Sequence, residues 1–315
     1  DQNEMRLFTR SLPESLKKIP SVLLQKTAYG QSSPYIRGLT AYRNKMLIDG
    51  IPLNFAAMRS GPNQYWSTVD MYSVKNLEIV KGISSVLYGS DAIGGVVEAF
   101  TKKANLNQND AFISSFTGRY SSAESSYIGR GDFSMNKKNI WGLYGGFTSY
   151  HFNDLKAGSG VLPETGYSQF AGDLRYDLEL TKKSRITLAT QSMRQEDVPR
   201  THKTVNAISY QGSSIGTEIQ RNYDQRRDLS YLKYTFENAV ITLSRQDHIE
   251  NRDRIRVGDN RDLQGFNVRD IGLSARFKKN WSETHNLAYG IEIHRQHAGS
   301  YSTAGTISNP FNSIG

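Results

Sequence analysis

The chain has 315 residues, a formal net charge of +9, a hydrophobic content of 37% and no cysteine. The lack of cysteine excludes disulfides, thiolate metal ligands and cysteine nucleophiles, and the spread of basic residues along the chain argues against nucleic-acid binding. No run of about 18 apolar residues occurs, so the sequence offers no membrane-spanning helix, whereas barrel strands that alternate polar and apolar residues are compatible with this composition.

The N-terminal third combines one helix signal with several short apolar runs. Ser11 before Pro13 and Glu14 predicts a helix over Leu12–Lys18, because a hydroxyl cap, an early proline and a first-turn acid suit the free amides of a helix start. Apolar runs bounded by turn residues predict the strands of one small sheet at residues 21–24, 45–48, 77–80 and 96–100. We therefore expect a compact, mixed α/β unit here.

From about residue 110 onward, apolar and polar residues alternate with a period of two, as in strands with one lipid-facing and one water-facing side. The apolar face includes Leu174, Tyr176, Leu178, Leu273 and Ile291, and the polar face includes Asp173, Arg175, Arg276 and Glu292. Weaker alternation elsewhere brings the total to about nine antiparallel strands between residues 110 and 300.

The connections between these strands alternate in length. Residues 137–139, 182–184 and 237–239 predict tight turns, whereas residues 153–166, 196–222 and 252–265 predict long polar loops. This pattern is typical of an outer-membrane barrel. A soluble β-sandwich is the alternative, but its strands rarely reach the roughly 9 to 11 residues needed to cross a bilayer. Because nine strands cannot close in lipid, we expect the native chain to continue beyond Gly315.

The N-terminal third also carries five short motifs in a fixed order. They are Tyr35-Ile36-Arg37-Gly38, Met46-Leu47-Ile48-Asp49-Gly50-Ile51-Pro52-Leu53, Leu77-Glu78-Ile79-Val80-Lys81-Gly82, Ser85-Val86-Leu87-Tyr88-Gly89 and Ala92-Ile93-Gly94-Gly95-Val96-Val97. Their order and spacing resemble the plug domain of TonB-dependent outer-membrane receptors. The resemblance implies a plug domain over residues 1–103, followed over residues 104–315 by the N-terminal part of a transmembrane β-barrel that would have 22 strands when complete.

Two residues depart from the family pattern, and one family motif is missing. Ile83 stands where the family usually has proline, and Glu98 stands where it usually has asparagine. The short segment that engages the energy-transducing partner is not found in residues 1–10. The resemblance therefore implies coupling to that partner without locating the contact.

The resemblance implies an active-transport receptor in the outer membrane of a Gram-negative bacterium, with lipid around its wall. Such a receptor binds a scarce metal chelate or cofactor outside and imports it with the TonB-ExbB-ExbD energy-transducing complex. An iron siderophore is the first expectation, haem or cobalamin the alternative, and a signalling or adhesion receptor on the same scaffold a third. No enzyme is expected, because the Gly-x-Ser-x-Gly and His-Glu-x-x-His elements are absent from the sequence.

In the family, the loop corresponding to residues 54–66 forms the floor of the ligand pocket. Aromatic faces, one planar guanidinium and adaptable amides suit that role. A shorter loop is expected beside it at residues 29–34. With one residue from that loop, the expected ligand-binding residues are Gln31, Phe55, Met58, Arg59, Asn63, Gln64, Tyr65 and Trp66. The alternative is structural: the aromatics pack against the barrel wall, and Arg59 pairs with a carboxylate of the lumen.

Two histidines near the end of the last strand, His294 and His297, are conceivable ligands for haem or a metal ion. Their spacing of three on a strand places the two rings on opposite faces. We therefore expect ordinary polar roles at a loop entrance rather than a joint site.

Overall fold

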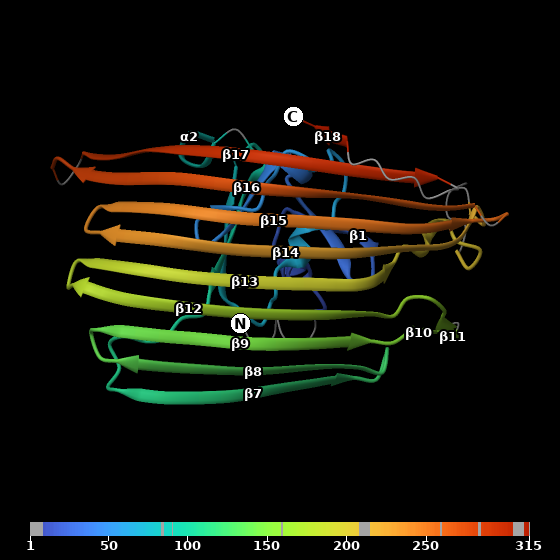
Figure 1. Ribbon diagram of the computed structural model, residues 1–315, viewed down its shortest axis with the longest axis horizontal. Coiled ribbons are helices and arrows are strands. Elements are labelled where there is room, and N and C mark those ends of the chain that lie inside the picture. The colour runs from blue at the N-terminus through green and yellow to red at the C-terminus, as the bar shows by residue number, and fades with distance from the viewer. Residues whose placement is uncertain are drawn as a thin grey trace.

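The computed structural model describes residues 9–82, 85–89, 91–158, 160–207, 215–258, 260–282, 285–304 and 312–314. Long antiparallel strands form one broad sheet, and the N-terminal elements pack behind its middle (Figure 1). Among the described residues, no helix has the length and apolarity needed to span a membrane. The first eight residues lie outside the described part, so the absence of the partner-binding motif from residues 1–10 concerns the sequence alone.

The N-terminal unit contains the predicted helix as a 3-10 helix, η1, with the expected bounds Leu12–Lys18. A hairpin of β1 (Val22–Ala28) and β2 (Gln31–Ile36) follows it. The four-stranded sheet has the order β4-β3-β6-β5, with bounds Ile51–Pro52, Asn44–Ile48, Gly95–Thr101 and Val74–Lys81. Two expectations were wrong: residues 21–24 pair with β2 instead of joining the small sheet, and most of the expected loop 29–34 is strand β2.

Short helical turns complete this unit: η2 (Ala41–Arg43), η3 (Tyr65–Thr68) and α2 (Ser85–Tyr88). The turn between β3 and β4 consists of Asp49 and Gly50, at φ 50° and 85°. Pairing of Ile48 with Ile51 on either side of these two residues makes it a two-residue hairpin turn, for which Asp-Gly is a preferred sequence.

The broad sheet contains the nine predicted strands in sequential antiparallel order, which confirms the expected architecture. Their bounds are β7 Ala111–Ser121, β8 Ser126–Lys137, β9 Trp141–Phe152, β12 Tyr167–Thr181, β13 Ser184–Pro199, β14 Glu218–Phe236, β15 Ala239–Arg256, β16 Asn260–Asn280 and β17 Asn286–Ala304. A short strand, β18 (Asn312–Ile314), pairs with β17, and β10 (Leu155–Ala157) with β11 (Gly160–Leu162) forms a separate hairpin.

The two faces of the sheet are as the alternation predicts. Leu174, Leu273 and Ile291 expose 45%, 44% and 58% of their surface on the side away from the N-terminal unit. The predicted lumen residues Asp173, Arg175, Arg276 and Glu292 lie on the opposite side, within ion-pairing or hydrogen-bonding reach of Arg130, Asp49, Gly50 and Lys45 respectively.

The prediction of a loop over residues 252–265 is wrong, because β15 extends to Arg256 and β16 begins at Asn260. Residues 196–199 and 218–222, also expected in a loop, belong to β13 and β14. The loop between these two strands contains η4 (Thr201–Lys203), and residues 208–214 lie outside the described part. The β15–β16 hairpin consequently extends beyond its neighbours at the long-loop end of the sheet (Figure 1).

The N-terminal unit and the wall share one apolar core. Leu12, Met46 and Trp66 are fully buried and belong to the same cluster as Tyr150 and Leu229 of the wall strands. Burial of this surface stabilises the seated arrangement through the hydrophobic effect. The N-terminal unit therefore relies on the wall for part of its core.

Candidate functional site

The loop between β4 and η3 contacts the wall strands β15 and β16. Phe55 stacks on His248 of β15 with ring centroids 4.4 Å apart, and it meets Tyr65 edge-on at 4.7 Å. Phe266 of β16 lies 5.9 Å from Phe55. These aromatic contacts fix the loop at the end of the wall that carries the long connections.

Glu250 of β15 is the polar centre beneath this loop. Its carboxylate accepts hydrogen bonds from Arg59 Nη2 at 2.6 Å and from Gln225 Nε2 at 2.8 Å. The amide of Gln64 also donates to it, and Arg200 Nη2 donates to Gln64 Oε1 at 2.7 Å. Charge-assisted hydrogen bonds of this kind hold the loop in one geometry.

The charges of the loop follow from this arrangement. Burial is the largest single influence on Arg59 and lowers its pKa, but Glu250 and Tyr65 together outweigh burial, so the pKa of Arg59 is raised above its ordinary value. For Tyr65, burial is the first cause and the Glu250 charge the second, and together they raise the pKa of its phenol. Arg59 therefore stays cationic and Tyr65 stays neutral at physiological pH.

Of the eight expected ligand-binding residues, the structure exposes only the side chain of Arg59, to 42%. The other seven are buried: Gln31, Phe55, Met58, Asn63, Gln64, Tyr65 and Trp66. Gln31 reaches the loop region through its hydrogen bond to Gln225 at 3.3 Å. Both amide atoms of Asn63 and the indole Nε1 of Trp66 are buried without a hydrogen-bond partner among the described residues. The structure thus forms one packed layer with a single exposed guanidinium.

The histidines of β17 lie on opposite faces, as their spacing predicts. His294 faces Asp270 and Glu292 at 2.9 and 3.2 Å, and His297 is exposed on the other side. Within the described ranges, no group of three or more histidine and acidic side chains is arranged to hold a metal ion. The histidines therefore have no shared site in this structure.

Sequence reasoning missed the wall side of this loop. Glu250, Arg200, His248 and Gln225 were not expected to contact it. Extending the polar face of Thr242 and Ser244 by even numbers along β15 would have pointed to His248 and Glu250, because residues two apart share one face of a strand. No local pattern indicates their partners in the N-terminal unit.

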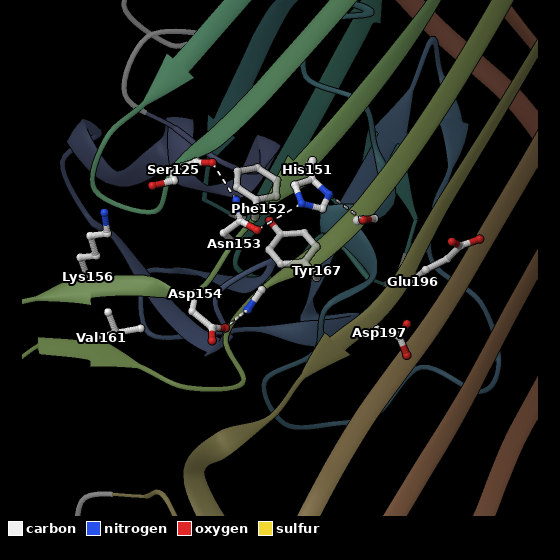
Figure 2. A pocket seen from close by; sticks show the side chains of 12 residues that line it. Ser125, His151, Phe152, Asn153, Asp154, Lys156, Val161, Tyr167, Glu196 and Asp197 are labelled. Carbon is white, nitrogen blue, oxygen red and sulfur yellow. Dashed lines mark hydrogen bonds between the residues drawn. The ribbon is translucent and has the colours of Figure 1, made fainter.

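A separate cavity of about 690 Å³ opens beside the β10–β11 hairpin (Figure 2). His151 lies on its wall and hydrogen-bonds Asn153 Oδ1 at 3.2 Å, while Asp154 accepts from the backbone amides of Thr165 and Gly166 at 2.8 and 2.9 Å. These polar groups brace the hairpin connection. None of the eight expected ligand-binding residues lines this cavity.

A buried ion pair anchors the N-terminal unit to β8. Arg130 Nη1 lies 3.1 Å from Asp70 Oδ2, and the Arg130 side chain is fully buried. Thr148 donates to the same carboxylate at 2.7 Å, Tyr150 donates to its other oxygen, and Asp173 lies 2.9 Å from Arg130 Nη2. Several partners therefore compensate each buried charge.

A second anchor lies at the short-turn end of the wall. Asp49 accepts hydrogen bonds from Tyr231 at 2.9 Å and from the Thr101 hydroxyl at 2.6 Å. Lys233 donates to the Asp49 carbonyl, and Arg276 Nη2 donates to the Gly50 carbonyl at 3.0 Å. The two anchors and the Glu250 contacts are all noncovalent, so the N-terminal unit is held without any bond that would prevent its movement.

Residues 1–96 match the family model described as the TonB-dependent Receptor Plug Domain. Heme/hemopexin utilization protein C of Haemophilus influenzae is 29% identical over 225 residues, which are 70% of this chain and 30% of that protein. The vitamin B12 transporter BtuB of Photobacterium profundum is 32% identical over 93 residues, 29% of this chain and 15% of that protein. The FrpB iron transporter of Neisseria meningitidis has a similar structure, with a TM-score of 0.75 at 16% identity over 95% of this chain and 48% of that chain.

The chain spans less than a third of the length of these curated relatives and about half of that solved chain. The plug match, the order of the motifs and the seating of the small unit against consecutive antiparallel strands all agree. Residues 1–96 belong to the TonB-dependent receptor plug domains, and the strands that follow form a wall whose fold is that of the solved transporter.

Proposed function

We propose that the whole receptor binds a scarce metal chelate or cofactor outside the outer membrane of a Gram-negative bacterium and imports it through a plugged barrel. The observation that carries this proposal is the Arg59 loop, which presents one exposed cation at the long-loop end of a plug that is seated in the wall by noncovalent contacts. A ligand that binds there would touch the plug itself, so binding and plug movement would be linked.

The energy for import would come from the TonB-ExbB-ExbD complex, in line with the family to which the plug belongs. The proposed division of the chain is a plug over residues 1–103 and barrel wall over residues 104–315, within a barrel of 22 strands. No catalytic step is part of the proposal. An adhesion or signalling role on the same scaffold would require further domains, and no residue of this chain favours it.

An iron siderophore remains the first candidate for the ligand. Haem is the second, because a relative that covers 70% of this chain is named for haem and hemopexin utilization. Cobalamin is the third, because the match to a vitamin B12 transporter is restricted to 93 residues. All three are metal chelates too large for simple diffusion through narrow pores.

For the binding site, we propose that Arg59 contacts the ligand directly and that the seven buried residues form the supporting layer beneath it. A planar guanidinium can grip a carboxylate or another anionic group of a chelate with two parallel hydrogen bonds. The buried donors and acceptors of Asn63 and Trp66, which lack partners in the described part of the chain, would become available if the loop shifts on binding.

The experiment is to purify the full-length receptor from its native membrane and to measure its visible absorbance and metal content. Iron with a siderophore or haem spectrum, or cobalt with a corrinoid spectrum, would support the proposal and identify the ligand. A protein that carries none of these after growth in the presence of all three, and that binds none of them afterwards, would contradict it.

A further inference from the structure

An arginine cluster lies beyond the plug loop, on the inward face of β14 and of the neighbouring β15–β16 hairpin. It consists of Arg221 on β14 and Arg252, Arg254 and Arg256 on β15. The pairing of β15 with β16 is regular from Ala239 to Arg256, so the three β15 arginines share the face of Glu250, which contacts the plug. The cluster therefore continues inward toward Arg59.

The acidic groups facing this cluster are too few to balance it. Asp262 is shared by Arg252 at 3.2 Å, Arg254 at 2.9 Å and Arg256 at 3.0 Å. Glu218 is shared by Arg221 and Arg254, the second at 3.6 Å. Four guanidinium groups thus meet two carboxylates among the described residues.

Three further features show that this region is electropositive and incompletely paired. Arg221 and Arg254 lie directly opposite each other in the β14–β15 pairing, and like charges in that position are destabilising. The Nε atoms of Arg221 and Arg252 are buried without a hydrogen-bond partner. Burial, followed by the charges of Arg221 and Arg200, lowers the pKa of nearby His202 in the η4 turn. The region is electropositive and retains unused donors.

We propose that the arginine cluster is a capture site for a ligand that carries two or more carboxylate groups, separate from and outside the Arg59 contact. This deepens the proposed function, on which it rests for the direction of ligand entry. Guanidinium forks bind carboxylates in a bidentate way. Successive inward residues on one strand are about 7 Å apart, which suits separate carboxylates on one ligand.

The test measures binding of citrate, a tricarboxylate, to the full-length receptor in detergent at low ionic strength by equilibrium dialysis. The double variant Arg252→Gln/Arg254→Gln should weaken citrate binding about tenfold or more. Arg252→Lys/Arg254→Lys keeps the positive charges but loses the planar guanidinium groups. Its citrate affinity should therefore lie between those of the wild type and the Arg252→Gln/Arg254→Gln variant. The matched control, Arg261→Gln/Arg269→Gln, changes two exposed arginines on the outward face of β16 and should bind like the wild type.

Correct folding of each variant is checked by the heat-dependent mobility of the barrel on a gel. Equal citrate affinity in the wild type and the Arg252→Gln/Arg254→Gln variant would overturn the capture site. An equal loss of citrate affinity in the Arg252→Gln/Arg254→Gln and Arg261→Gln/Arg269→Gln variants would overturn it as well. The assay needs no transported ligand. Citrate binding that depends on the cluster, together with a failed transport test, would therefore reject the proposed function but not this site. Successful transport by a receptor whose citrate binding does not depend on the cluster would reject this site alone.

Discussion

Arg130 of the wall and Asp70 of the plug form an ion pair of 3.1 Å in which both side chains are almost wholly buried. Breaking such a pair leaves one charge uncompensated in a poorly solvated site. We predict that Asp70→Asn or Arg130→Met lowers the free energy of unfolding of the plug by about 3 to 5 kcal/mol.

The measurement is urea unfolding of the plug followed by Trp66 fluorescence, in a full-length receptor whose other tryptophans are replaced by phenylalanine. The double variant Asp70→Asn/Arg130→Met removes both charges and should recover much of the loss. Single and double variants with equal stability would show that the pair does not anchor the plug.

The second prediction concerns the turn at the other anchor. Gly50 has φ +85°, so Gly50→Ala should lower plug stability by about 1 kcal/mol, because an L-residue is strained there. Gly61→Ala is the control, since Gly61 has no neighbouring atom within 4 Å of an added Cβ and no positive φ. Similar urea midpoints for the two variants would contradict the assigned turn geometry.

The third prediction is a pH dependence from Glu98, which stands where the family usually has asparagine. Burial is the first cause that raises the pKa of Glu98, and the charges of Asp49 and Glu78 add to it against Arg276 and Lys233. The folded plug therefore binds a proton more tightly than the unfolded chain does. Its stability should fall as the pH rises from the ordinary carboxyl pKa through the raised one.

Glu98→Gln removes this titration, so it should flatten the profile in that window and stabilise the plug at neutral pH. Urea midpoints at several pH values, from about 4 to 8, measure the effect. A wild-type plug that instead gains stability as the pH rises, with Glu98→Gln removing that gain, would reverse the assigned sign.

The fourth prediction concerns the membrane face. Spin labels at Leu174 and Leu273 should be accessible to oxygen and protected from water-soluble relaxation agents, because both side chains are exposed on the apolar face. A label at the exposed Lys156 of the β10–β11 hairpin should show the opposite behaviour. Water accessibility at both leucines would refute the barrel orientation.

The sequence predicts the fold well wherever one face of a strand is apolar. The alternation from Phe170 to Leu180 indicates both the strand and its orientation, which the structure confirms for Leu174 and Asp173. It fails in residues 252–256, where Ile255 is the one apolar side chain and a single apolar residue sets no alternation. It also fails in β2, because this strand buries polar residues. Ser32 is fully buried, and its backbone amide donates a hydrogen bond to Ser67 Oγ at 3.1 Å.

The sequence predicts the plug side of the candidate site but not the wall side. The composition of residues 54–66 indicates the loop, but the partner of Arg59 lies 191 residues away in the sequence. No local pattern specifies such a contact, because it depends on how the plug is seated in the wall. The sequence therefore left open whether Arg59 pairs with a lumen carboxylate, and the structure shows that it does while keeping part of the guanidinium exposed.

The fifth prediction concerns the ligand contact. Arg59→Ala and Trp66→Ala should each weaken binding of the ligand found in the purified receptor by about 1 to 3 kcal/mol. Trp66 is fully buried, so its removal should also lower plug stability, whereas Arg59→Ala should affect binding more than stability. Lys17→Ala, at an exposed position on η1, is the control. Unchanged affinity in both variants would shift the site to the loops of the wall.

The proposed function requires that the whole receptor, with its plug seated, imports its ligand with energy from TonB. The most direct test measures uptake of the ligand identified in the purified protein by cells that express the full-length receptor, with and without functional TonB. We expect accumulation inside the outer membrane only when TonB is functional, and only surface binding without it. Equal uptake in both strains would contradict the account, because the chain would then behave as a passive pore.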